Sequence, residues 1–318
     1  MGFKQRTEAV MHNANFQPAY LRLEQNGELA RRAQILYLLL RKCRLCPRQC
    51  GVNRLKGEMG VCESSSRVKV AAAHAHFGEE RPLVGQYGSG TIFFSRCNLL
   101  CVYCQNWQIS HRGEGHLITD AALGRLMLRL QQMGCHNINL VTPTHFVANI
   151  VQALRTAVAG GLHLPLVYNC SGYEPQEVLP LLEGIVDIYL ADFKYADGVM
   201  AARYSYDAPD YPEVDAAALF EMHRQVGDLV VDENGIALRG LMIRHLVLPR
   251  NIARTDRFVR FVADRLGRST YVNLMSQYRP ECGASRYPEL SRPITRQEYS
   301  QAVDWAREAG LTNLHLQG

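Results

Sequence analysis

Long hydrophobic runs are absent from this sequence of 318 residues. The longest, Ile35 to Leu40, falls far short of the ~20 apolar residues that a membrane-spanning helix needs. Met1 to Tyr20 also lacks the basic start and apolar stretch that are typical of a secretory signal. We therefore expect a cytoplasmic protein that has no membrane partner.

An excess of charge of one sign is missing as well. The 35 basic and 30 acidic residues leave a net charge of +5, and only 8% of the residues are aromatic. Proteins that bind single-stranded nucleic acid combine a basic groove with stacking aromatics, and no such stripe is visible here. Nucleic acid is therefore not an expected partner. Because 47% of the residues are hydrophobic and 20% are charged, a sizeable core is available and wholesale disorder is excluded.

Ten cysteines are the conspicuous feature that remains. Because no export signal is visible, reduced thiolates that hold metal are a better interpretation than disulfides. Seven cysteines fall into two groups, and Cys135, Cys170 and Cys282 are isolated. We expect Cys135 to be a buried apolar residue and Cys282 to lie in a loop. Cys170 is the isolated cysteine that could reach an active site.

The chain changes character at about residue 66. An apolar stripe with helical spacing precedes a loop-like segment, residues 43–66, that is punctuated by proline and glycine. We predict that residues 1–66 form a helical, cysteine-rich extension and that residues 67–318 form the main domain.

Short apolar runs alternate with amphipathic stretches through the main domain, which is typical of repeated βα units. Because the runs are continuously apolar, we expect strands of a parallel sheet that is buried on both faces. Six units are too few for a closed eight-stranded barrel, so we predict an α/β fold with a partial (β/α)₆ barrel; a doubly wound sheet is the alternative. The expected strands are residues 90–95, 137–141, 166–169, 185–193, 241–248 and 270–275, and the expected helices are 119–133, 145–159, 175–183, 212–226, 252–266 and 295–309.

Cys97, Cys101 and Cys104 follow the first expected strand with the spacing C-x₃-C-x₂-C. Working residues of parallel α/β folds lie at the carboxyl ends of the strands, which is where this loop begins. Three thiolates can hold one face of an iron–sulfur cluster, which normally takes four cysteines. One iron would then be open to an exogenous ligand. A zinc site completed by a distant residue is the alternative.

Cys43, Cys46, Cys50 and Cys62 form the upstream group, with the spacing C-x₂-C-x₃-C-x₁₁-C. Four ligands suffice for a closed zinc site or for a complete second [4Fe–4S] cluster, and the spacing does not choose between them. A cluster here could relay electrons to the first one or position a partner, whereas zinc would have a structural role.

The three-cysteine loop resembles that of the radical S-adenosylmethionine (SAM) enzymes, in which a C-x₃-C-x-aromatic-C loop binds a [4Fe–4S] cluster. Over about residues 43–290 the chain resembles the pyruvate formate-lyase activating enzyme-like branch of that superfamily. The stretches that carry this resemblance are Phe77 to Glu80, Gly90 to Phe94, Gln105-Asn106, Val141 to Phe146, Tyr168 to Tyr173, Asp192 to Tyr195 and Arg244 to Pro249. The resemblance implies a partial (β/α)₆ barrel and anaerobic cytoplasmic chemistry. SAM is the implied cosubstrate, which binds the open iron and is cleaved to a 5′-deoxyadenosyl radical.

The resemblance also implies which residues surround SAM. Tyr103 and Asn106 belong to the cluster loop. Thr142 and Thr144 stand where other members carry a Gly-Gly-Glu stretch that meets the amino group of SAM, although a turn before a capped helix would explain both threonines equally well.

Polar residues end the next three strands. Asn169 and Ser171 suit ribose hydroxyls or the SAM carboxylate. Asp192 and Lys194 point the same way, and the resemblance assigns them to the SAM site or to a monovalent-cation site; a structural ion pair is the alternative. His245 corresponds to a position near the adenosine, although a satisfied core histidine is equally expected. Further on, Asn273 and Gln277 could face the substrate.

Two arginines depart from the pattern of the branch. Arg96 precedes the cysteine loop and Arg250 follows Pro249, at positions where glycine is common. Glycine tolerates positive φ and close backbone approach, and arginine resists both. We therefore expect either loop to be reshaped without loss of cluster ligation.

The expected function is that of a radical SAM oxidoreductase that abstracts hydrogen from a substrate. The branch suggests activation of a glycyl-radical enzyme, with flavodoxin or ferredoxin as the electron donor. The alternatives are radical modification of another small molecule, peptide or RNA, and a non-catalytic electron-transfer or scaffold protein. The non-catalytic alternative explains the cysteines, but it does not explain the polar residues at the ends of the second, third and fourth strands.

Overall fold

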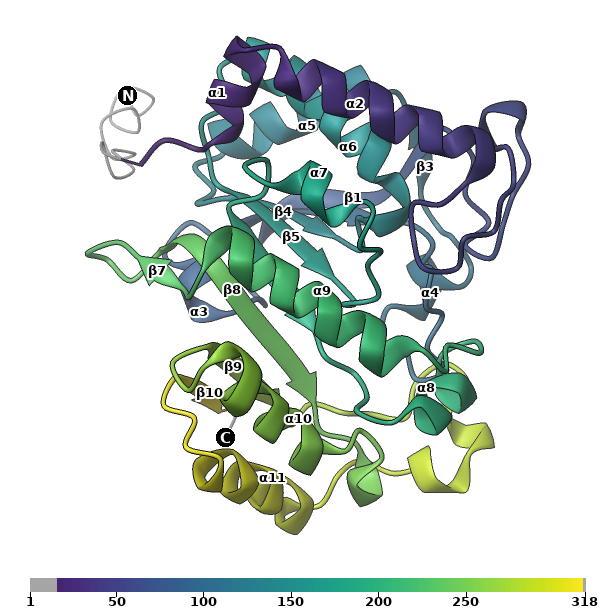
Figure 1. Cartoon of the computed structure of the whole chain (residues 1–318), viewed down its shortest axis with the longest axis vertical. Coiled ribbons are helices and arrows are strands. Elements are labelled where there is room, and N and C mark those ends of the chain that lie inside the picture. Colours follow the sequence, from purple (N-terminus) through teal and green to yellow (C-terminus); the bar gives the residue numbers. More distant parts are fainter. Residues whose placement is uncertain (1–15, 317–318) are drawn as a thin grey trace, which may run out of the picture.

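Strands and helices alternate along most of the chain in a computed structural model, which describes residues 16–316 (Figure 1). The expectations for residues 1–15, including the absence of a secretory signal there, lie outside the described residues. No helix within residues 16–316 is both long enough and apolar enough to cross a membrane.

Parallel strands form the centre of a single ten-stranded sheet. They follow one another across the sheet in chain order, whereas the strand order of a doubly wound sheet reverses. The arrangement is therefore that of a barrel wall, as predicted. The strands are β2 (Ser89–Phe94), β4 (Ile138–Val141), β5 (Leu166–Cys170), β6 (Ile188–Asp192), β8 (Ala237–Leu246), β9 (Tyr271–Met275) and β10 (Leu314–Leu316).

All six predicted strands are confirmed as β2, β4, β5, β6, β8 and β9, and β10 was not predicted. Three further strands are antiparallel: β1 (Val68–His76), which joins β2 to β3 (His116–Ile118), and β7 (Val230–Val231) beside β8. The sequence missed β1 because much of this strand is only half-buried and does not form an apolar run. Within the described residues, the sheet ends at β3 and β10, which do not pair with each other, so the barrel stays open.

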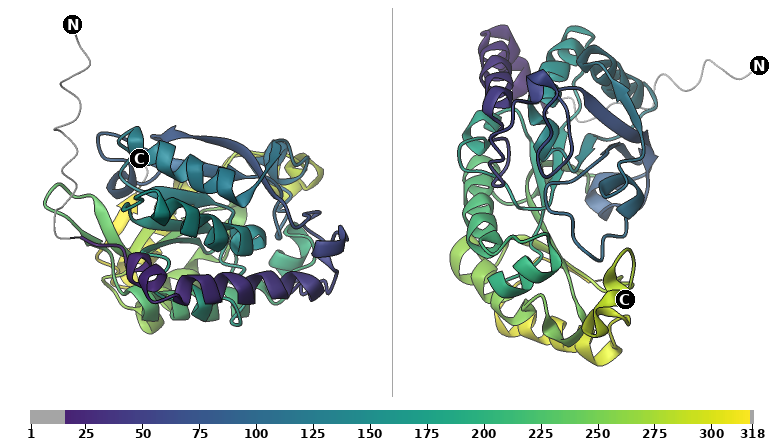
Figure 2. Two further views of the ribbon diagram at one scale, coloured as in Figure 1. Left: turned by 90° about the horizontal axis from the view of Figure 1, so that it is seen from above. Right: turned by 90° about the vertical axis from the view of Figure 1, so that its right-hand side faces the viewer.

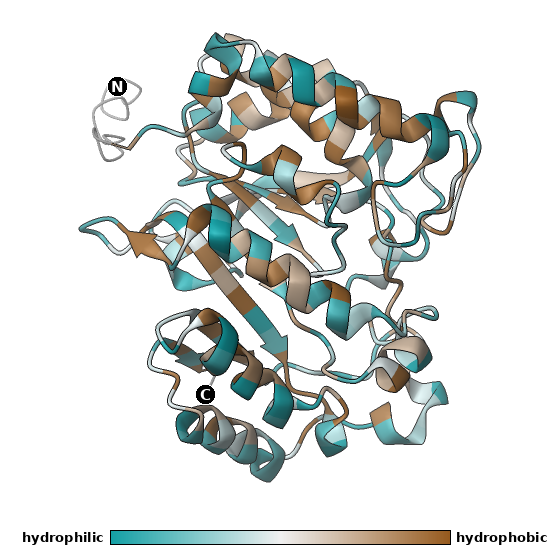
Figure 3. Ribbon diagram, in the orientation of Figure 1, coloured by the Kyte–Doolittle hydropathy of each residue, from teal (hydrophilic) through white to brown (hydrophobic). Residues whose placement is uncertain are grey.

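Helices cover one face of the sheet (Figure 2), and polar and apolar residues alternate along them (Figure 3). Buried residues of the helices and of the strands share one hydrophobic core. Thr119 and Thr295 cap two of them by accepting a backbone N–H, an interaction worth about 1 kcal/mol. The helices of the main domain are α3 (Arg81–Val84), α4 (Trp107–Ser110), α5 (Asp120–Gln132), α6 (Val147–Ala159), α7 (Leu179–Leu182), α8 (Gly198–Tyr204), α9 (Tyr211–Val226), α10 (Thr255–Phe261) and α11 (Arg296–Glu308).

The amino-terminal extension packs on the helices of the main domain. It contains α1 (Tyr20–Gln25) and α2 (Glu28–Leu39), and Leu29 and Leu36 of α2 are fully buried in the same core as the residues of α6. The hydroxyl of Tyr20 donates to the carbonyl oxygen of Leu164 at 2.7 Å. The extension thus shares its hydrophobic core with the barrel, and the domain boundary at residue 66 stays a prediction.

Candidate active site

Cys97, Cys101 and Cys104 lie on the loop between β2 and α4, at the carboxyl end of the first parallel strand. Two residues with positive φ shape this loop: Arg96 at 76° and Leu100 at 50°. The chain therefore keeps, at Arg96, the conformation that favours glycine, so the arginine strains the loop instead of reshaping it.

Hydrogen-bond donors surround the three sulfurs. The hydroxyl of Ser205 lies 3.0 Å from Cys101 Sγ, and that of Ser110 lies 3.1 Å from Cys104 Sγ. Burial raises the pKa of Cys101 to about 12, and the ammonium of Lys194 partly opposes this rise. A thiol with such a pKa is protonated at neutral pH, so metal binding there releases a proton.

The three thiols line a cavity of about 220 Å³ at the carboxyl ends of the parallel strands. Seven of the nine residues that the resemblance assigns to SAM also line it. They are Tyr103, Asn106, Thr142, Asn169, Ser171, Asp192 and Lys194. Cys170 and Gln277 line the same cavity, as the sequence suggested, whereas Cys135 is fully buried elsewhere and Cys282 is exposed. The sheet brings these strand ends together because its strands run parallel.

Thr142 is strained within the cavity wall. Its φ is 60°, which is a rare conformation for a β-branched residue. The conformation is held by its backbone N–H, which donates to the carbonyl oxygen of Asn169 at 2.9 Å. Strained backbone of this kind is concentrated at functional sites.

A partly buried charge network forms one side of the cavity. Asp192 of β6 and Arg244 of β8 are neighbours in register, and Nε of Arg244 donates to Asp192 Oδ1 at 2.8 Å. Nζ of Lys194 donates to the other carboxylate oxygen at 2.8 Å. Burial alone would raise the pKa of Asp192, but Arg244 and Lys194 outweigh burial and lower it. The carboxylate is therefore charged at neutral pH.

Glu79 extends this network from a distant part of the chain. Nη1 of Arg244 lies 3.2 Å from Glu79 Oε2, and its Nη2 donates to Asn169 Oδ1 at 2.6 Å. Next to Glu79, Glu80 accepts a hydrogen bond from Asn273 at 2.8 Å. The segment before α3 therefore carries two carboxylates into the concave side of the sheet.

Sequence reasoning missed Arg244 and Glu79 of this network, as well as Ser110 and Ser205 beside the sulfurs. A signal for Arg244 was present, because a charge near the end of an apolar strand is the same pattern that identified Asp192. Glu79 lies in the stretch Phe77 to Glu80, which carries part of the resemblance, but that stretch gave it no role, since Glu79 precedes α3 and meets the strand ends only in the folded chain.

Two predicted SAM residues lie outside the cavity. His245 is fully buried on the helix-covered face, where its ring stacks on Phe258 at 4.2 Å and hydrogen-bonds the carbonyl oxygen of Phe193 at 2.7 Å. Successive residues of a strand point to opposite faces, so His245 faces outward because Arg244 faces inward. The structure thus favours the satisfied core histidine.

Thr144 is also buried away from the cavity. Its hydroxyl donates to the carboxyl of Glu174, which Tyr168 also hydrogen-bonds at 3.2 Å. The hydroxyl is therefore used within the core, and of the two threonines only Thr142 is placed to meet a ligand.

The upstream cysteines lie on a loop that follows α2. Cys43, Cys46 and Cys62 are buried and Cys50 is partly so, and none forms a disulfide. Burial raises the pKa of Cys46, and the nearby Cys62, Cys43 and Cys50 thiols raise it further. The four thiols thus lie near enough to influence the pKa of Cys46, and the metal site that the sequence predicts for them stays a prediction.

No three Cys, His, Asp or Glu side chains within residues 16–316 stand close enough together to enclose a single metal ion. The fit of a cluster at Cys97, Cys101 and Cys104 depends instead on the donor set. The three thiols line one cavity of about 220 Å³. Thiolates are the usual ligands of iron–sulfur clusters, so the residues present suit a cluster.

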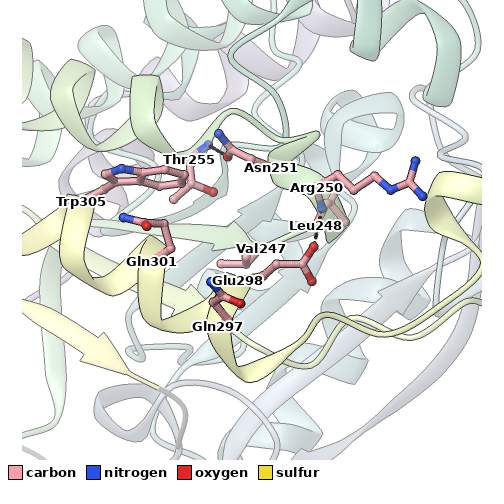
Figure 4. Close-up of a pocket in the computed structure, with 9 residues that line it drawn as sticks. All are labelled: Val247, Leu248, Arg250, Asn251, Thr255, Gln297, Glu298, Gln301 and Trp305. Carbon is pink, nitrogen blue, oxygen red and sulfur yellow. Dashed lines mark hydrogen bonds between the residues drawn. The ribbon is translucent and has the colours of Figure 1, made fainter.

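A second cavity, outside the barrel, lies between the end of β8 and α11 (Figure 4). Arg250 borders it with a φ of 56°, so this position, too, keeps the conformation that favours glycine. The backbone N–H of Arg250 donates to Glu298 at 2.7 Å, while its guanidinium points away from the cavity. None of the ten cysteines lines this cavity, which is also mostly apolar.

No protein-family model matches the chain. A curated protein of Methanocaldococcus jannaschii, the uncharacterized protein MJ0674, is 30% identical to it over 286 residues. The match covers 88% of this chain and 78% of that protein. The chain belongs to the same family as MJ0674.

Solved structures that are similar to this MJ0674-family chain are more distant. SuiB of Streptococcus suis, in a crystal structure bound to S-adenosylmethionine, is 12% identical with a TM-score of 0.46, over 70% of this chain and 48% of SuiB. The protein anSMEcpe, solved with bound AdoMet, is 11% identical with a TM-score of 0.45, over 69% of this chain and 58% of anSMEcpe. The chain thus spans about half the length of SuiB.

Proposed function

We propose that this MJ0674-family chain is a radical SAM enzyme. Cys97, Cys101 and Cys104 would hold a [4Fe–4S] cluster, and SAM would occupy the cavity beside it. The observation that supports this proposal is that the three thiols share one cavity with polar groups from the ends of four parallel strands.

The surroundings of the sulfurs suit a cluster. The backbone N–H of Leu99 donates to Cys97 Sγ at 3.3 Å, and two serine hydroxyls donate to the sulfurs of Cys101 and Cys104. Such donors orient ligands and stabilise the thiolate form. When bound and reduced, a [4Fe–4S] cluster supplies the electron that cleaves SAM to methionine and a 5′-deoxyadenosyl radical.

The polar wall suits a zwitterionic nucleoside. Lys194 and Arg244 offer cationic donors that can orient a carboxylate, and Asn169 and Ser171 can hydrogen-bond ribose hydroxyls. Because Asp192 already accepts from both cations, it holds them in place. This ion pair accounts for Asp192 without the monovalent cation that the resemblance implied.

The finer assignment rests on the resemblance of the cysteine loop and its neighbouring motifs. On that basis we propose that the substrate is a protein, a glycyl-radical enzyme, that flavodoxin or ferredoxin donates the electron, and that the chemistry takes place in the cytoplasm. Genomic neighbours provide the first test, since an adjacent glycyl-radical enzyme would identify the partner.

The decisive experiment is anaerobic reconstitution followed by dithionite and SAM, with chromatography for 5′-deoxyadenosine. We expect product from the wild type, none from Cys101→Ala, and wild-type amounts from the matched control Cys135→Ala, which alters a cysteine that is buried away from the cavity. No product from a cluster-replete wild type would favour the non-catalytic electron-transfer or scaffold alternative.

A further inference from the structure

The loop of the upstream cysteines contacts the loop of Cys97, Cys101 and Cys104, and one of the contacts comes from an arginine. Arg48 lies between Cys46 and Cys50, and its Nε donates to the carbonyl oxygen of Asn98 at 2.9 Å. Asn98 directly follows Cys97. A residue of the upstream group therefore holds the backbone beside a candidate cluster ligand.

The other nitrogens of Arg48 widen this contact. Nη2 donates to the carbonyl oxygen of Ser205 at 2.9 Å, and Nη1 donates to that of Asp207 at 2.7 Å. The hydroxyl of this same Ser205 donates to Cys101 Sγ. The guanidinium of Arg48 thus hydrogen-bonds backbone next to Cys97 and at the serine that binds Cys101, both in or beside the loop of Cys97, Cys101 and Cys104 (the catalytic loop). A lysine cannot form these three hydrogen bonds at once.

Arg96 contacts the upstream loop from the side of the catalytic loop. This residue precedes Cys97, and its Nη2 lies 2.7 Å from the carboxylate of Glu63, which directly follows Cys62. Its Nη1 donates to the carbonyl oxygen of His111 at 2.6 Å. An arginine at this strained position therefore gains contacts that glycine would lack.

The upstream thiols have surroundings suited to metal-bound sulfur. Arg54, which is only 1% exposed, places its guanidinium 4.0 Å from Cys43 Sγ, and the N–H of Val61 donates to Cys50 Sγ at 3.4 Å. Positive charge and N–H donors favour thiolate over thiol.

Gly60 passes directly over one of these sulfurs. A Cβ at Gly60 would lie 2.6 Å from Cys50 Sγ, closer than real side chains approach. Only a glycine allows the loop to close over Cys50, so the path of the backbone is itself adapted to the sulfur.

We propose that Cys43, Cys46, Cys50 and Cys62 hold a second metal centre, closed by four thiolates, that fixes the upstream loop against the catalytic loop. The ligand is a thiophilic metal, either a zinc ion or an iron–sulfur cluster. Binding and folding of small thiolate sites are coupled, so the sulfurs close around the metal as it binds. Arg48 and Glu63 then act as positioning residues for the neighbourhood of Cys97 and Cys101.

Metal analysis of the anaerobically purified full chain tests the centre. We expect the triple variant Cys97→Ser/Cys101→Ser/Cys104→Ser to retain one metal centre per chain. Zinc without iron would identify a zinc site, and iron with acid-labile sulfide would identify an iron–sulfur cluster.

A second variant keeps the test valid if the triple variant does not fold. In an otherwise wild-type chain, Cys46→Ser/Cys62→Ser should lose the same metal centre, whereas Cys282→Ser should lose no metal. A triple variant that folds without metal, or thiol titration that finds disulfides among the four, would overturn the proposal.

Electron paramagnetic resonance tests the positioning role. Arg48→Ala should keep the upstream metal but alter the spectrum of the reduced catalytic cluster, in the same direction as Cys46→Ser/Cys62→Ser. Arg48→Lys should not restore the spectrum. The matched control is Arg44→Ala, because Arg44 lies on the same loop and, within residues 16–316, forms its ion pair with the exposed Glu177 at 3.8 Å. A wild-type spectrum for Arg48→Ala would remove the positioning role.

The two proposals can fail separately. The upstream metal is measured without SAM cleavage, so its retention in a chain that forms no 5′-deoxyadenosine would refute the proposed function and leave the second centre standing. SAM cleavage by a chain whose upstream cysteines bind no metal would do the opposite.

Discussion

Asp192 and Arg244 face each other across neighbouring strands, and Nε of Arg244 donates to the carboxylate at 2.8 Å. The same guanidinium reaches Glu79 at 3.2 Å, so one cation compensates two carboxylates that are removed from bulk water. Without Arg244, Lys194 still pairs with Asp192, but Glu79 is left without a cation, and an uncompensated charge costs more than the pair itself contributes.

We therefore expect Arg244→Ala to destabilise the fold by roughly 3–5 kcal/mol in urea unfolding. Arg307→Ala is the matched control, because Arg307 forms an exposed pair with Asp304 at 4.0 Å, and its loss should change the unfolding free energy by less than about 1 kcal/mol. Equal effects of the two substitutions would show that the network at Arg244 is not a stabilising one.

Glu174 predicts a pH dependence of stability. Burial raises its pKa from 4.5 to about 8, although hydrogen bonds from Thr144 and Tyr168 oppose the rise. The folded state therefore holds this proton more tightly than the unfolded state does. Its contribution is complete below pH 4.5 and is lost as the pH rises toward 8, with a slope of up to about 1.4 kcal/mol per pH unit.

Glu174→Gln removes the titrating group and keeps the shape. Unfolding free energies measured at several pH values between 5 and 8 should fall less steeply for the variant than for the wild type. Asp187, whose pKa burial raises to about 7, is present in both chains, so the difference between them isolates Glu174. Identical slopes of unfolding free energy against pH in the two chains would mean that a group other than Glu174 takes up the proton.

Arg250 and Arg96 predict different changes in stability when each is replaced by glycine. Both have positive φ, which costs a non-glycine residue roughly 1–2 kcal/mol. Arg250 uses its backbone N–H to bind Glu298, and glycine keeps that bond. Arg250→Gly should thus stabilise the fold by about 0.5–1 kcal/mol, once the greater entropy of an unfolded glycine is subtracted.

Arg96→Gly relieves the same strain but removes the contacts to Glu63 and His111, so no stabilisation is expected. Thermal unfolding measures both variants, and Arg250→Ala, which keeps the strained backbone, should stay close to the wild type. Destabilisation by Arg250→Gly would mean that its exposed guanidinium has a structural partner.

Ser205 predicts a change in redox behaviour. Its hydroxyl donates to Cys101 Sγ at 3.0 Å and is itself fully buried. Hydrogen bonds to ligand sulfurs stabilise the reduced, more negative state of a cluster. Ser205→Ala should therefore shift the reduction potential of the proposed cluster to more negative values in a redox titration, and an unchanged potential would contradict this contact.

The sequence by itself determined the parallel strands except β10, most of the helices and the cysteine loop after the first strand. These features are local: a continuously apolar run, a helical period or a cysteine spacing is visible within a few residues. The positions of Asn169, Ser171, Asp192 and Lys194 followed, because parallel strands place their carboxyl ends at one edge.

Only the tertiary structure decided which side each strand-end residue faces and which distant segments meet. His245 faces the core because Arg244 faces the cavity, and this choice depends on register with β6. Glu79 reaches the site from a segment far from the strands that it contacts, and Arg48 meets Asn98 across 50 residues of chain. No short pattern encodes such meetings, because they arise when the whole sheet curls and buries its polar groups in pairs.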